Sequence, residues 1–132
     1  AVMNNKNTGM FVIENKELTI NALNHVEGAL KRSLNNMNLI NDNKSNKDFD
    51  ISKSCKETIE FLAFLIKTLD HKDKNTKLSK DLDYLYKHCI FCLVRVRDHN
   101  DFEFLNTSIK VLSEISEGWE RVTAAVVNSQ GN

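Results

Sequence analysis

The chain has 132 residues, no proline and only four glycines, so it contains few residues that interrupt a helix. Its 18 basic and 18 acidic side chains give a net charge of zero, which argues against nucleic acid or an anionic membrane as a partner. No run of about 18 apolar residues is present, so we expect no membrane insertion.

The first stretch of helical periodicity runs from about Asn15 to Asn41, with apolar residues stepping by three or four. An all-polar break follows at 41–47, rich in side chains that compete for backbone hydrogen bonds, and it predicts a loop. Residues 1–14 precede the periodic stretch and are expected to form an N-terminal tail, either extended or a short helix.

The second and third periodic stretches cover Asp50–Leu69 and Lys77–Asp98, and a polar break at 70–75 separates them. The third stretch shows the cleanest heptad pattern of the chain, which predicts one buried seam. The seam consists of Leu78, Leu82, Leu85, Cys89, Cys92 and Val96.

The fourth stretch follows a short acidic turn. Asn100 is predicted to be its N-cap, with Glu103 three residues later completing a capping box. Its apolar residues, Trp119 and Val122 among them, continue at helical spacing as far as Val126. The polar residues 128–132 are expected to form a disordered tail.

Short connections between four helices force consecutive helices to run antiparallel. The sequence therefore predicts an all-α protein, an antiparallel four-helix bundle formed by a single domain over residues 15–127. The three cysteines, and polar residues where a signal peptide would need apolar ones, favour the cytoplasm.

Cys89 and Cys92 form a CxxC pair, a pattern that binds zinc or performs redox chemistry when it lies at a helix start. Both cysteines lie mid-helix on the predicted seam, so we interpret them as core residues. None of the four histidines has a glutamate three residues before it, which excludes the di-iron pattern of helical bundles. No metal, cofactor or small-molecule substrate is expected.

Arg95 and His99 offer a second hypothesis, a helical ribonuclease of the toxin type, in which an arginine and a histidine act on the phosphodiester. Only three residues separate them, and a cation at a helix end is favoured by the helix dipole without any function. We therefore expect a protein that is not an enzyme.

Aromatic residues on the faces opposite the seams are the feature that packing does not explain. Tyr84 and Phe91 lie seven residues apart, nearly opposite the third seam, with Val94 beside them. Phe61 and Phe64 lie away from the apolar stripe of the second helix in the same manner. An apolar stripe bordered by charges indicates a partner-binding surface, a dimer contact, or a groove that the chain itself fills.

The apolar run Met10, Phe11, Val12 and Ile13 could fold back over these aromatics as an N-terminal cap segment. Such a cap and a binding groove are compatible, because a partner can displace a segment that lies in a groove.

The third and fourth stretches resemble the flagellin-specific export chaperone family (FliS). The likeness lies in Leu82-Asp83-Tyr84-Leu85-Tyr86, in the Asn100-Asp101 turn, and in a tryptophan late in the last helix, Trp119. The run Glu27-Gly28-Ala29-Leu30 is similar to the Asp-Gly-Ala-Leu of the family's first helix. The chain departs from the family in lacking proline before the first helix and in carrying Phe11 where the family has tyrosine.

The resemblance implies a helical bundle that holds the disordered C-terminal segment of flagellin in the cytosol, prevents premature polymerisation and aids delivery to the export apparatus. A component of the export gate is a possible second partner. On this interpretation, Phe61, Phe64, Tyr84, Phe91 and Val94 contact the client. A self-associating bundle, whose aromatic face forms a dimer contact, is the third hypothesis.

Overall fold

The computed structural model describes the backbone of residues 5–69 and 77–130, and the side chains of residues 20–69 and 77–128. This part of the chain consists of helices and turns without a strand. Its helices are α1 (Asn5–Asp42), α2 (Ile51–Lys67), α3 (Lys77–His99) and α4 (Leu105–Gln130). The predicted all-α four-helix bundle is confirmed.

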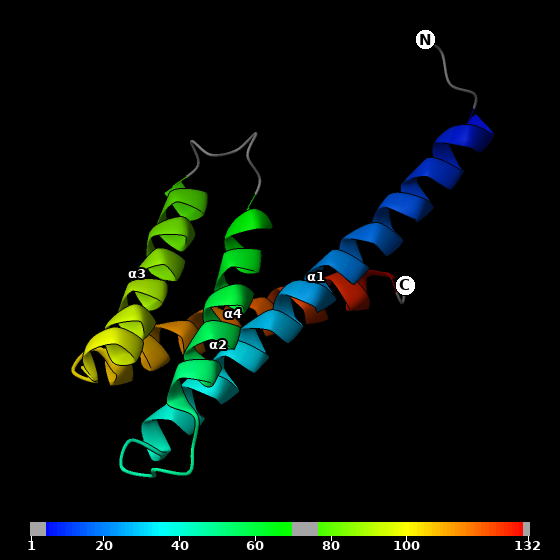
Figure 1. Ribbon diagram of the computed structural model, residues 1–132. Coiled ribbons are helices and arrows are strands. Elements are labelled where there is room, and N and C mark those ends of the chain that lie inside the picture. The colour runs from blue at the N-terminus through cyan, green and yellow to red at the C-terminus, as the bar shows by residue number, and fades with distance from the viewer. Residues whose placement is uncertain (1–4, 70–76, 131–132) are drawn as a thin grey trace.

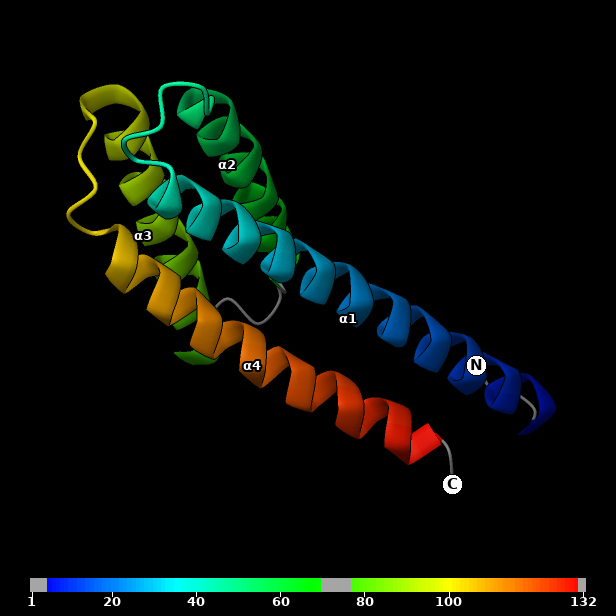
Figure 2. The same cartoon turned by 90° about the horizontal axis from the view of Figure 1, so that it is seen from below.

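The four helices pack in a ring in which each contacts two neighbours. The helix α1 packs on α2 and α4, and α3 also packs on α2 and α4. Figure 1 shows α2 and α3 as one antiparallel pair, with α1 diverging from them toward its N-terminus. Figure 2 shows α1 and α4 side by side in opposite directions, both continuing beyond α2 and α3. The bundle is therefore closed at one end and splayed at the other.

The core is built from the faces that the periodicity predicted. Fully buried side chains come from every helix, since each has one apolar stripe and must cover it against a neighbour. The buried apolar residues are Val26, Ala29, Leu30, Met37, Ile40, Cys55, Leu62, Leu65, Tyr86, Cys89, Cys92, Leu93, Val96, Leu105 and Leu112.

The helices at the two ends of the chain are longer than predicted. The helix α1 begins at Asn5 rather than near Asn15, so the backbone of 5–14, predicted as a separate tail, continues α1. No proline interrupts this segment, although its Asn, Thr and Gly residues are weak helix formers. Likewise α4 includes residues 128–130, predicted as part of a disordered tail. The side chains of Met10–Ile13 lie outside the described residues, so the cap segment stays a prediction.

The turn between α3 and α4 differs from the predicted capping box. Asn100 ends α3 with a φ of 53°, and its N–H donates to the carbonyl of Val96 at 3.0 Å. Asp101 Oδ1 accepts the Glu103 N–H at 3.0 Å, and α4 begins only at Leu105. The prediction of Asn100 as an N-cap was wrong because asparagine also tolerates the left-handed conformation that terminates a helix.

Candidate partner-binding grooves

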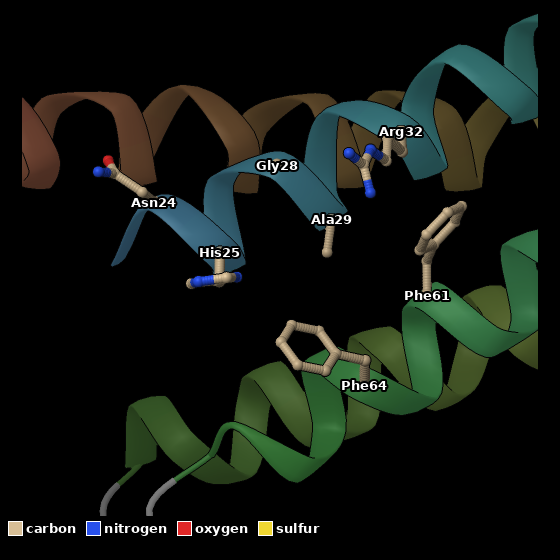
Figure 3. Close-up of a pocket in the computed structure, with 7 residues that line it drawn as sticks. All are labelled: Asn24, His25, Gly28, Ala29, Arg32, Phe61 and Phe64. Atoms are coloured by element: carbon tan, nitrogen blue, oxygen red, sulfur yellow. The ribbon is translucent and has the colours of Figure 1, made fainter. Parts of the chain in front are cut away.

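A groove of about 470 Å³ lies between α1 and α2 (Figure 3). Residues of α1 form one wall, and two phenylalanines of α2 form the other. Both rings project from α2 toward α1 in Figure 3, so the aromatic residues face the groove. The lining consists of Asn24, His25, Gly28, Ala29, Arg32, Phe61 and Phe64.

Arg32 gives this first groove a positive charge. Its guanidinium carbon lies 5.8 Å from the centroid of the Phe61 ring, within the range of a cation–π contact. Arg32 forms no salt bridge with any residue whose side chain the structure describes. The groove thus combines exposed aromatic surface with a cation that no carboxylate of the described chain neutralises.

A second groove, of about 540 Å³, opens where α1, α2 and α4 meet, and a third, of about 410 Å³, lies between α3 and α4. The second is lined by Ala22, Leu23, His25, Val26, Phe64, Thr68 and Trp119. The third is lined by Leu78, Leu82, Ile115, Gly118, Trp119 and Val122, all of them apolar or glycine.

The three grooves share residues. His25 and Phe64 line both the first and the second groove, and Trp119 lines both the second and the third. We call this connected set of grooves the groove track. Its lining residues come from α1 and α2 at one end and from α3 and α4 at the other.

Trp119 is held in place from the core side. Burial raises the pKa of the Tyr86 hydroxyl to about 12, and a hydrogen bond with the Trp119 side chain opposes this shift. Tyr86 itself is only 1% exposed. Trp119 packs partly buried against the core that includes Tyr86, and its side chain lines both the second and the third groove.

The structure divides the predicted binding residues between two surfaces. Phe61 and Phe64 line the first groove, and Phe64 is 41% exposed. Tyr84 and Phe91 are 69% and 53% exposed on α3, and partly buried Val94 lies near them in sequence. These three α3 residues line none of the three grooves.

The exposed rings of α3 are bordered by charged and polar groups, as the sequence predicted. The Tyr84 ring stacks with that of His88 at a centroid distance of 6.3 Å, and the Arg95 guanidinium lies 5.8 Å from the Phe91 centroid. An exposed aromatic surface with a polar border is therefore present on α3, separate from the groove track.

Sequence reasoning missed the third groove. It placed Leu78 and Val122 on buried stripes, yet they are 68% and 47% exposed. Both lie where the helices splay. The apolar stripes of α3 and α4 continue there, but no neighbouring helix covers them, so these two side chains are exposed. Gly118 in the middle of the fourth helix could have indicated this groove. A glycine there destabilises the helix and leaves open space where other residues have a side chain.

The cysteines are core residues, as predicted. Cys55, Cys89 and Cys92 are free and buried. Burial raises the pKa of the Cys55 thiol to about 11 and that of Cys89 to about 12, and it also raises that of Cys92. Among the described residues, no three His, Cys, Asp or Glu side chains gather into a group that could hold a metal ion.

Arg95, the arginine of the ribonuclease hypothesis, has a structural contact. Its Nε donates to Asp101 Oδ2 at 2.8 Å across the α3–α4 turn. The Glu103 N–H and then the Arg95 guanidinium hold the pKa of the Asp101 carboxyl below its usual value. The arginine is therefore oriented toward the turn.

Comparison with known proteins gives one informative match. The sequence matches the family model described as "Flagellar protein FliS" over residues 2–126. No match is found among curated proteins or among solved structures. In the described part of the chain, no helix is both long and apolar enough to cross a bilayer. The match spans nearly the whole chain and agrees with its four-helix fold, and the protein therefore belongs to the FliS family of flagellar proteins.

Proposed function

We propose that this member of a flagellar export chaperone family binds the disordered C-terminal segment of flagellin in the cytosol. Binding prevents premature polymerisation of flagellin and aids its delivery to the export apparatus, where a component of the export gate is a second partner. The observation that carries the proposal is the exposed apolar surface at the groove track, with Phe64 and Trp119 at its junctions.

Exposed rings on a helical bundle suit a disordered client. Such a client has no surface of its own to match, so it gains free energy by placing apolar side chains in preformed grooves as it orders. We infer that Phe61 and Phe64 contact one part of the client, and that Tyr84, Phe91 and Val94 contact another as it wraps around the bundle.

The wrapping mode also accounts for release. Ordering a disordered segment costs part of the interaction free energy, so a long contact surface yields only moderate affinity. Moderate affinity permits the client to leave when it reaches the exporter.

The double replacement Phe64→Ser and Phe91→Ser tests the proposal. We expect the Kd for a flagellin C-terminal peptide, measured by isothermal titration calorimetry, to rise about tenfold or more, because truncating a central aromatic contact typically costs over 1 kcal/mol. Helicity measured by circular dichroism should change little, since Phe64 and Phe91 are 41% and 53% exposed.

Phe104→Ser is the matched control. Phe104 is also 41% exposed, but it belongs neither to the lining of the groove track nor to the proposed contact residues of α3, so its replacement should leave the Kd unchanged. Equal loss of affinity in the control, or unfolding of the double variant, would remove the support for Phe64 and Phe91 as contacts.

Two rival functions have their own outcomes. If the aromatic surface only self-associates, analytical ultracentrifugation will show a dimer that the double variant converts to a monomer, and no flagellin peptide will bind. If the protein is a ribonuclease, it will cleave RNA and His99→Ala will abolish the cleavage.

A further inference from the structure

We infer that the client lies along the groove track in one fixed direction, with a carboxylate of the client beside Arg32 and its purely apolar part between α3 and α4. This inference rests on the proposed function and deepens it, because it states which chemistry each part of the client presents and which residue selects it.

The continuity of the grooves is the first support. Neighbouring grooves share lining residues, His25 and Phe64 at one junction and Trp119 at the other, so an occupant of the second groove contacts residues of the first and third. One polypeptide segment can therefore occupy all three grooves without leaving the surface.

The two ends of the track differ in charge. The α1–α2 end carries Asn24, His25 and Arg32, and the α3–α4 end is lined by apolar residues and glycine alone. A nearby lysine, Lys31, is already engaged by Glu27 at 3.0 Å and by Glu120 at 3.4 Å, whereas Arg32 has no carboxylate partner in the described chain. A carboxylate of the client is the group that complements Arg32 at this end.

Glycines in mid-helix are the third support. A Cβ added to Gly28 would meet nothing within 4 Å, and one added to Gly118 would meet only the Arg121 guanidinium at 3.9 Å. Packing within the described chain therefore requires neither glycine, although each weakens its helix relative to alanine. Gly28 lines the first groove and Gly118 the third, where a missing side chain lets a client approach the helix backbone.

The charge at Arg32 is tested by a double-mutant cycle with two flagellin C-terminal peptides. One peptide has the natural sequence, and in the other every Asp and Glu is replaced by Asn or Gln. Because Arg32 is exposed, we expect Arg32→Gln to weaken binding of the natural peptide about two- to fivefold at low salt and to leave binding of the neutral peptide unchanged. The difference should shrink as the NaCl concentration rises.

Lys110→Gln is the control for this cycle, since Lys110 is an exposed cation of α4 that lines no groove of the track. Equal affinity of the wild-type protein for the two peptides would overturn the inference, as would equal effects of Arg32→Gln and Lys110→Gln. If neither peptide binds the wild-type protein, the proposed function itself fails.

The path along the track is tested with leucine substitutions. Gly28→Leu and Gly118→Leu should each weaken binding of the natural peptide about tenfold, since either side chain fills space the client needs. The corresponding alanine variants should raise the urea midpoint of unfolding, because alanine favours the helix. Asn35→Leu in α1 and Thr107→Leu in α4 place the same side chain on exposed positions outside the track and should not change the Kd.

The leucine variants also define the extent of the path. Loss of affinity at Gly28 without loss at Gly118 would confine the client to the first groove and overturn the continuous path. Urea unfolding of each variant shows whether a loss of affinity arises from a loss of stability.

Discussion

At the scale of the residue, burial decides the chemistry of the cysteines. A CxxC pair is reactive when a helix N-terminus or a cation stabilises the thiolate. Here Cys89 and Cys92 are each about 1% exposed, and burial disfavours the charged form of both thiols. The motif is therefore a pair of small apolar residues that completes the core.

These buried thiols predict a loss of stability in alkaline solution. The ordinary pKa of a cysteine is 9.0 here, and folding raises it to about 11 for Cys55 and about 12 for Cys89. Above pH 9 the unfolded chain releases protons that the folded chain retains, so the free energy of unfolding falls as the pH rises from 9 toward 12. Urea unfolding followed by circular dichroism at several pH values measures this dependence.

Cys89→Ala gives the comparison for the alkaline series. The variant lacks one of the shifted thiols, so its free energy of unfolding should fall less steeply above pH 9. An identical slope in variant and wild type would show that Cys89 does not contribute to the dependence.

At the scale of the element, the α3–α4 turn shows how side chains end one helix and start the next. Asn100 adopts the left-handed conformation, and Asp101 then accepts hydrogen bonds from the Glu103 N–H and the Arg95 guanidinium. Together these contacts position Leu105, where α4 begins and which is fully buried. The turn thus sets the start of the helix that carries Trp119.

Replacing Asp101 by alanine should destabilise this turn. Both hydrogen bonds to its carboxylate are lost, so the urea midpoint of unfolding at pH 7 should decrease. Since these bonds lower the pKa of Asp101, their contribution is present above the ordinary pKa of 3.8 and is lost as the pH falls through the lower folded value. The difference between variant and wild type should therefore shrink in strong acid.

Asp81→Ala is the control for the turn, because Asp81 is exposed on α3 and none of the described salt bridges includes it. It should leave the midpoint unchanged. A midpoint that falls equally in both variants would assign the effect to net charge rather than to the turn.

At the scale of the whole molecule, the bundle has a sealed part and an open part. Leu112 is fully buried in the core, whereas Leu78 is 68% exposed near the start of α3, although both occupy apolar stripes of their helices. This separation lets one small domain keep a stable core and still expose apolar surface.

Because one part of the bundle is sealed and the other open, replacing leucine by alanine should reduce the free energy of unfolding by different amounts in the two parts. Leu112→Ala should lower the free energy of unfolding by about 2–5 kcal/mol, since it leaves a cavity in a packed core. Leu78→Ala should change it by only about 0.5 kcal/mol, as surface substitutions do. Urea denaturation of the two variants measures both values, and a large loss in Leu78→Ala would mean that the third groove is closed.

The sequence alone determined the number of helices in the described chain, their antiparallel order and the faces that form the core. Each of these follows from local information. The apolar period shows where a helix lies and which of its faces is buried, and short connections make consecutive helices antiparallel neighbours. The buried cysteines and the exposure of Phe64, Tyr84 and Phe91 follow from the same period. The family resemblance was visible in the order of short motifs, and the family match confirms it.

Only the tertiary structure decided which of these faces meet and where they separate. A sequence period gives the direction of a side chain around its own helix and carries no information about the angle between two helices. The splay of the bundle therefore exposes Leu78 on a stripe predicted to be buried, and it joins Phe64 of α2 to Trp119 of α4 along one track. Packing geometry also decides that Phe61 lies beside Arg32, a pairing of α1 with α2 that no local pattern contains.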